Sequence, residues 1–233
     1  LFPHTTYHYN SGGDPKDIPD LSYEELVEFY QSHYHPSNAI FMTFGNQSAY
    51  DLQAQFESLA LSKFEKGQTL YSTPETRLTA PIEVTESYAL DADDLTDKTY
   101  HVMSWLLPQA SDVKLRLGMR FVVAILLVDS ASPLRHYLET CGYAQSTGPL
   151  MGVDDSNFEM TFYCGIQGSN PEHAEAFKTG VLKVLNEVAA QPANPELVDA
   201  ILHQIELHQR EINGDGTPYG LSLILNGLSS AIH

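Results

Sequence analysis

The stretch that most constrains the fold is residues 11–46, in which turn, helix and stop signals follow one another closely. Gly12 and Gly13 permit positive φ angles and Pro15 cannot lie inside a helix, so the segment SGGDP at 11–15 predicts a turn. The chain is therefore expected to change direction before its first long helix.

A helix is predicted shortly after this turn. Ser22 followed three residues later by Glu25 has the spacing of a capping box, which places the helix start at Ser22. Pro36 disfavours helical backbone in the residue before it, so the helix is expected to end near His33. The apolar run at 39–44 then predicts a strand.

The next segments are a second helix and a linker. Apolar residues recur at helical spacing over 49–64 and predict an amphipathic helix that ends before Gly67. Residues 67–81 are rich in Thr, contain Pro74 and Pro81, and show no sustained periodicity. We expect the main linker of the chain there.

Beyond the linker the periodicity changes. Alternating apolar residues predict strands at 82–90 and 99–107, joined by a turn at 91–97. The segment 113–128 is apolar on nearly all sides after Met119, which is typical of a helix buried between layers.

The last third of the chain contains several further elements. A short helix is predicted between Ser132 and Gly142, and two long helices are expected to open alike, each with an Asn cap, a Pro and a Glu. The remaining predicted features are strands near 144–146 and at 158–167 separated by a turn, long helices from Asn170 and from Asn194, an end of the second at Gly214 and Gly216, and a last helix from Tyr219 to Ile232. Strands followed by packed pairs of helices predict an α+β fold, with helices on one face of a sheet.

Composition limits the classes of partner. The 233 residues include 12 Lys and Arg against 30 Asp and Glu, a net charge of −18. Nucleic acids and anionic membranes both require concentrated positive charge, so neither is expected as a partner. The acidity favours either solubility or the attraction of basic peptides. With 42% hydrophobic and 18% charged residues, the composition is that of an ordinary globular protein.

The cysteines and the apolar runs bear on the compartment. Cys141 and Cys164 match no metal or redox spacing, which favours reduced structural thiols in the cytoplasm or in another reducing compartment such as an organelle matrix. No signal peptide is visible, and the sequence opens without Met, as expected for a piece of a longer chain. The longest apolar run, 121–128, is shorter than the roughly 20 residues of a membrane span.

The order of motifs in the first segment resembles a known family. SGGDP at 11–15, IPDLSYEELVEFYQSHYHPSNA at 18–39 and a strand-like run ending in GN at 45–46 are similar to the presequence protease branch of the pitrilysin or insulinase-type zinc metallopeptidases. Beyond residue 46 the resemblance is looser but collinear to the end.

The resemblance implies a fold and a domain plan. Such enzymes are built from four related α+β domains, arranged as two bowl-shaped halves around a closed chamber. Residues 1–66 would be the C-terminal part of the catalytic, zinc-bearing domain, and residues 67–81 the linker. Residues 82–233 would be most of a second, non-catalytic domain of the layered kind found in mitochondrial processing peptidase, with an antiparallel-rich sheet packed on helices.

The zinc motif of that family, H-x-x-E-H on a helix, does not occur in this sequence. His136 and Glu139 supply its first half, but Thr140 stands where the second His is needed. His203 and His208 are one residue too far apart, which places them about 140° apart around a helix axis, so they cannot converge on one ion.

Other motifs also favour structural roles. His33 and His35 lie at a helix end, where His side chains can contact free carbonyl groups. Tyr23, Phe29 and Tyr30 form an aromatic helix face for which core packing is expected. No nucleophile elbow, phosphate loop or dinucleotide fingerprint is present, and the glycine-rich segment 214–220 favours a turn.

The sequence therefore offers no catalytic residue and no metal ligand, and it leaves the substrate-binding residues unknown. By resemblance, we expect a part of a zinc metalloendopeptidase that degrades unstructured peptides in a closed chamber. This part would form chamber wall and structural support, contact the remaining domains of the same chain, and be inactive alone, with zinc only in the parent. The alternative is a non-catalytic scaffold or peptide-binding relative of the same fold.

Overall fold

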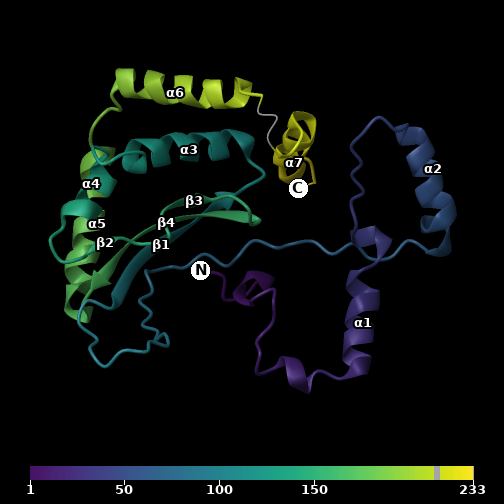
Figure 1. Ribbon diagram of the computed structural model, residues 1–233, viewed down its shortest axis with the longest axis horizontal. Helices are drawn as coiled ribbons and strands as arrows, with labels where there is room; N and C mark the ends of the chain where they lie inside the picture. Colours follow the sequence, from purple (N-terminus) through teal and green to yellow (C-terminus); the bar gives the residue numbers. More distant parts are fainter. Residues whose placement is uncertain (213–215, 233) are drawn as a thin grey trace. The chain divides into compact units, whose positions relative to one another are not determined.

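The structure is a computed structural model that describes residues 1–212 and 216–232, with side chains up to Leu228 (Figure 1). Its internal contacts separate two compact units, residues 2–73 and residues 74–233. Among the described residues, no helix is long and apolar enough to cross a membrane.

Unit 2–73 is helical and contains no strand. Its elements are η1 (Thr6–His8), η2 (Ile18–Asp20), α1 (Tyr23–His33), η3 (Pro36–Asn38), α2 (Ala49–Leu59) and η4 (Leu61–Lys63), where η marks a short 3-10 helix. The predicted start of α1 is confirmed, because the Ser22 hydroxyl accepts the Glu25 N–H at 3.2 Å. The Glu25 carboxylate in turn accepts the Ser22 N–H at 2.8 Å.

Two predictions for this unit are wrong. The helix expected over 49–64 ends at Leu59, because Ala60 leaves helical geometry (φ −134°, ψ −60°) and the chain tightens into η4. The strand expected at 39–44 is absent, because a strand needs a ladder partner and unit 2–73 has no second strand.

No residue of unit 2–73 is buried. The aromatic face of α1, which the sequence predicts to be core, is open: Tyr23, Phe29 and Tyr30 expose 75%, 53% and 60% of their surfaces. Short amphipathic helices gain most of their stability from packing an apolar face. Unit 2–73 does not cover this face of α1 by itself.

Unit 74–233 is built on an antiparallel sheet, as the α+β prediction requires. Its strands are β1 (Thr99–Gln109), β2 (Ser146–Thr147), β3 (Gly152–Asp154) and β4 (Glu159–Ser169). The sheet has the order β1-β4-β2, and β3 also pairs with β4. In the β1–β4 register, Val102 lies opposite Gly165 and Ser104 lies opposite Tyr163.

Helices cover one face of this sheet (Figure 1). The helices of the unit are α3 (Val113–Leu127), α4 (Pro133–Thr140), α5 (Ala174–Ala189), preceded by η5 (Pro171–His173), α6 (Pro195–Arg210) and α7 (Tyr219–Ile232). In Figure 1, α3 lies between the sheet and α6. The core combines side chains from β4 with side chains from α3, α4 and α5, namely Leu126, Leu127, Leu134, Leu138, Phe162, Cys164, Ile166, Phe177 and Val181.

Most predicted elements of this unit are confirmed, with three corrections to the strands and helices. The strand expected at 82–90 is absent from the ladder, although 99–107 falls within β1. Strand β3 lies where the sequence predicts a turn. Helix α3 is not buried all round after Met119, because only Leu126 and Leu127 are buried and Val122 exposes 42% of its surface.

The two Asn-Pro-Glu segments do not begin helices in the same way. Asn194 caps α6 as predicted, its side-chain oxygen accepting the Glu196 N–H at 3.0 Å. Asn170 makes no cap, because both ends of its amide are bonded to Asp97 at 2.8 Å, one to the N–H and one to the carboxylate. Helix α6 ends at Arg210, ahead of the predicted stops at Gly214, which lies outside the described residues, and Gly216.

A buried carboxylate attaches the start of this unit to the sheet. The Glu159 side chain is only 2% exposed, and its two oxygens accept the Glu75 N–H and the Arg77 guanidinium, each at 2.6 Å. Arg77 also donates to the carbonyls of Leu106 and Leu107, at 2.8 and 2.9 Å, where the β1–β4 register is irregular. Residues 75–77 are thus held to one end of the sheet.

The Arg77–Glu159 pair yields a first prediction. Arg77→Ala leaves a buried carboxylate with one donor fewer, and breaking such a pair costs about 2 to 3 kcal/mol when one partner is half exposed. The free energy of unfolding of unit 74–233, followed by the fluorescence of Trp105, should fall by that amount. Arg135→Ala removes an exposed pair with Glu139 and should cost under about 1 kcal/mol. Equal losses in both variants would contradict the attachment role.

Helices α4 and α5 approach closely at a glycine. A Cβ at Gly180 would overlap the Tyr137 hydroxyl, which bonds the Tyr143 hydroxyl and lies 3.3 Å from the Ala176 carbonyl. Burial and this hydroxyl pair raise the pKa of Tyr143, so the phenol stays neutral.

Gly180→Ala should therefore destabilise the unit by about 1 to 3 kcal/mol through overpacking, although Ala is the better helix former. Gly118→Ala in α3 is the matched control, because no atom lies within 4 Å of the added Cβ. It should stabilise the chain by up to about 1 kcal/mol. Denaturant titration of both variants checks this, and a stabilised Gly180→Ala chain would disprove the close approach.

Candidate functional site

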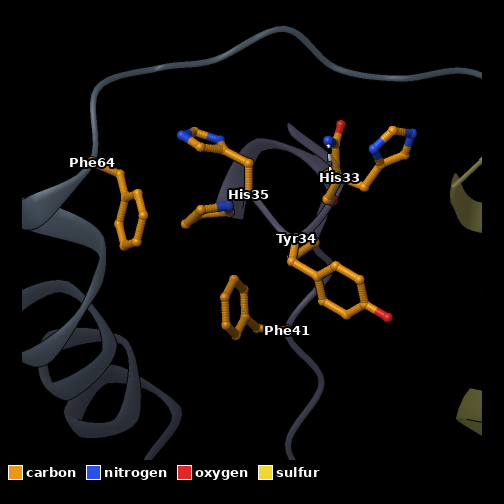
Figure 2. Close-up of a pocket in the computed structure, with 8 residues that line it drawn as sticks. His33, Tyr34, His35, Phe41 and Phe64 are labelled. Carbon is orange, nitrogen blue, oxygen red and sulfur yellow. Dashed lines mark hydrogen bonds between the residues drawn. The ribbon is translucent and has the colours of Figure 1, made fainter. Parts of the chain in front are cut away.

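A surface pocket lies in unit 2–73, where α1 ends. We call it the His33–Phe64 pocket, and its volume is about 370 Å³. Its lining residues come from the end of α1, from η3, from the extended chain after η3 and from the end of η4: His33, Tyr34, His35, Pro36, Asn38, Ala39, Phe41 and Phe64. Figure 2 shows His35 between Phe64 and Tyr34, with Phe41 below.

His33 has the structural role that the sequence predicts. Its Nδ1 lies 3.1 Å from the Phe29 carbonyl, one turn earlier in α1, and 2.8 Å from the Ser32 hydroxyl. Its ring stacks on the Phe29 ring with centroids 3.9 Å apart. His33 is thus engaged with its own helix, and Figure 2 shows its ring directed away from that of His35.

His35 positions the opposite wall instead of contacting a carbonyl. Its Nδ1 accepts the Ser37 N–H at 3.1 Å and so caps η3. This bond assigns the proton of the neutral ring to Nε2. The ring meets Phe64 edge to face, with centroids 5.4 Å apart. A Cβ on Gly67 would lie 2.9 Å from the ring, so the backbone at Gly67 packs directly against it.

Hydrogen bonds join η3 to the segment after η4. The Gly67 N–H donates to the Ser37 hydroxyl at 2.9 Å, and the Leu70 N–H donates to the Asn38 side-chain oxygen at 2.8 Å. The Asn38 amide nitrogen donates to the His33 carbonyl at 3.3 Å. Two parts of the unit that are distant in sequence, 33–38 and 67–70, are therefore joined beside the pocket.

A second hollow adjoins this pocket along α2. Its volume is about 670 Å³, and Phe41 lines both. Leu52 and Phe56 of α2 face it, and the rings of Phe41 and Phe56 lie 5.3 Å apart. The two hollows form one largely apolar surface, which can take up apolar groups but contains no nucleophile paired with a base.

The residues considered for zinc do not fit that ion. On α4, the Glu139 carboxylate accepts from Arg135 at 2.8 Å, and this bond lowers the pKa of Glu139. Thr140 donates to the His136 carbonyl at 2.7 Å and offers no imidazole. His203 and His208 lie on the continuous helix α6, on different faces. Within the part of the chain that the structure describes, no group of three His, Cys, Asp or Glu side chains could hold a metal ion.

The two cysteines behave as core thiols. Cys164 is fully buried on β4, and burial raises the pKa of its thiol to about 12. Cys141 is partly buried and lies 3.6 Å from the Leu138 carbonyl. The Cys164 thiol is therefore not ionised near neutral pH. Neither cysteine forms a disulfide.

Sequence reasoning missed the surface itself. Phe41 and Phe64 carry no motif, and they meet His35 only because the chain turns at Pro36 and again after α2. The one available indication of an exposed apolar surface was that the apolar residues of 39–44 had no partner strand within 2–73.

Comparison with known proteins gives a consistent set of relatives. The sequence profile of the family described as Peptidase M16 inactive domain matches residues 20–205, and so includes parts of both units. The chain is 33% identical over 226 residues to the mitochondrial presequence protease of Xenopus laevis, and 29% identical over 226 residues to that of Mus musculus. It is 31% identical over 238 residues to presequence protease 1, chloroplastic/mitochondrial, of Arabidopsis thaliana.

These alignments cover 96%, 96% and 100% of this chain, in the same order, but 22% of each relative. The chain thus spans about a fifth of the length of the curated relatives that it matches.

Proposed function

Because the chain belongs to the M16 peptidase family, with most of its length matching the inactive domain, we propose that it is the non-catalytic part of a zinc-dependent metalloendopeptidase. The whole enzyme degrades unstructured peptides in a closed chamber. This part supplies chamber wall and structural support, and it is inactive alone.

The observation that carries this proposal is the contrast between the two units. Unit 74–233 has a core of its own, made of aliphatic and aromatic side chains without a reactive cluster. Unit 2–73 buries no residue, yet it exposes the aromatic face of α1 and the apolar hollows beside α2. Such a unit is suited to packing against further polypeptide. The relatives are about fivefold longer than this chain, so the remaining domains of the same chain are the candidate for that polypeptide.

The domain plan remains part of this proposal. Residues 1–66 form the end of the catalytic domain, residues 67–81 the linker, and residues 82–233 the second domain. The division of the structure between residues 73 and 74 falls inside that linker and supports the plan. The strand-like run at 39–44, unpaired in this unit, would then add to a sheet made by other residues of the catalytic domain.

The zinc ligands and the catalytic base belong, in this proposal, to residues outside the given sequence. When bound there, zinc would activate a water molecule for attack on a peptide bond. The residues of this chain bind no metal and move no proton in that reaction. They contribute packing and surface.

Compartment and substrates follow the same reasoning. The relatives carry mitochondrial or chloroplastic in their names, which supports a reducing organelle matrix and agrees with the unpaired thiols. Unstructured peptides are the proposed substrates of the whole enzyme, and neither nucleic acid nor a membrane is a proposed partner of this acidic chain.

Zinc content and peptidase activity test the proposal. The 233-residue chain, purified in buffer containing zinc and passed through a desalting column, should retain far less than one zinc per chain. It should also leave an internally quenched unstructured peptide uncleaved, because no described side-chain set fits the metal. Turnover that a chelator abolishes would overturn the assignment of the chemistry to other residues. If zinc is retained, His203→Ala and His136→Ala chains show whether α6 or α4 holds it.

A further inference from the structure

The segment predicted as linker is fixed to unit 2–73 at its start. The Gly67 N–H donates to the Ser37 hydroxyl at 2.9 Å, and the Leu70 N–H donates to the Asn38 side-chain oxygen at 2.8 Å. The amide nitrogen of Asn38 donates in turn to two carbonyls at the end of α1, each at 3.3 Å. Residues 67–70 are therefore a structural part of unit 2–73.

The same segment is fixed to unit 74–233 from Glu75 onward. The Glu75 N–H donates to one oxygen of the buried Glu159 carboxylate at 2.6 Å, and the Arg77 guanidinium donates to the other oxygen. Glu75 exposes only 4% of its surface. Release of this backbone would break charge-assisted hydrogen bonds and leave a buried carboxylate without its donors, which is costly. Fixed backbone thus begins at Glu75.

Residues 71–74 lie between these two attachments. All of them are exposed, and Tyr71 exposes 81% of its surface. Among the described residues, none forms a hydrogen bond, an ion pair or a ring contact with any residue of 71–74. The boundary between the two compact units falls inside this stretch, between residues 73 and 74. Residues 71–74 are therefore the part of 67–81 that no contact holds.

Pro74 narrows the conformational freedom of this stretch. Its ring fixes its own φ at roughly −65°, and it disfavours helical backbone in Thr73. Rotation is therefore concentrated at Tyr71 and Ser72. When fully extended, residues 71–74 span at most about 14 Å, whereas the whole of 67–81 would span about 50 Å. The stretch can turn, but it cannot lengthen much.

We propose that residues 71–74 are a short joint at which the two units change orientation, and that the neighbouring residues 67–70 and 75–77 are fixed structure. The bond from Leu70 to Asn38 ends the joint on one side, and the bond from Glu75 to Glu159 ends it on the other. Because the joint is short, ordering it costs less conformational entropy than ordering a linker over 67–81 would. The units turn at one point of the chain instead of moving on a long tether.

Backbone order parameters from nitrogen-15 relaxation of the 233-residue chain test the joint. Values below about 0.6 are expected at Tyr71, Ser72 and Thr73, and values near about 0.85 at Leu70 and Glu75, as along β4. A low value at Leu70 or at Glu75 would overturn the proposal, because the flexible segment would then extend beyond the joint. Values near 0.85 throughout 71–73 would overturn it as well, since the chain would then be rigid across the boundary.

A variant pair tests what ends the joint. Asn38→Ala removes the acceptor of the Leu70 N–H, so the order parameter of Leu70 should fall to the range of Tyr71 while that of Glu75 stays unchanged. Asn46→Ala is the matched control, because Asn46 is an exposed residue of the same unit and makes no hydrogen bond among the described residues. It should leave Leu70 unchanged. An Asn38→Ala chain in which Leu70 stays as rigid as in the control would contradict the proposed end of the joint.

Discussion

The antiparallel pairing of β4 is the interaction on which unit 74–233 depends. All other described strands pair with β4, and its side chains Phe162, Cys164 and Ile166 meet residues of α3, α4 and α5 in one core. The Glu159 carboxylate at its start also holds the segment that enters the unit. Burial of apolar surface is the main favourable term in folding, so this core stabilises unit 74–233 without contacts from outside it.

Unit 2–73 presents the opposite situation. Its helix starts and turns are well formed, as the Ser22 cap and the bonds around Asn38 show, but hydrogen bonds at exposed positions contribute little net stability. What it lacks is a covered apolar face. This difference supports the proposal that the chain is a structural part of a larger peptidase, because one unit has its own core and the other leaves an apolar face uncovered.

How far the sequence predicted the fold depended on the range of the interactions involved. The start of α1 and the helix α4 were predictable because caps and prolines act within a few residues. The strands at 39–44 and 82–90 were not, because a strand exists only with a partner that local pattern cannot supply. Strand β3 is too short to show a periodicity.

Other differences between the sequence predictions and the structure arise from contacts between residues that are distant in the chain. Asn170 has a capping sequence, but Asp97, distant in the chain, takes both ends of its amide. In the same way, the His33–Phe64 pocket depends on the return of the chain after α2, whereas the structural role of His33 was predictable because it contacts a carbonyl of its own helix.

The most direct test of the central claim is residue-resolved amide hydrogen exchange on the 233-residue chain. We expect slow exchange along β4 and α4, limited by opening of the core, and fast exchange throughout α1 and α2. Protection of the α1 amides equal to that of β4 would contradict it, because unit 2–73 would then be stable without any further polypeptide.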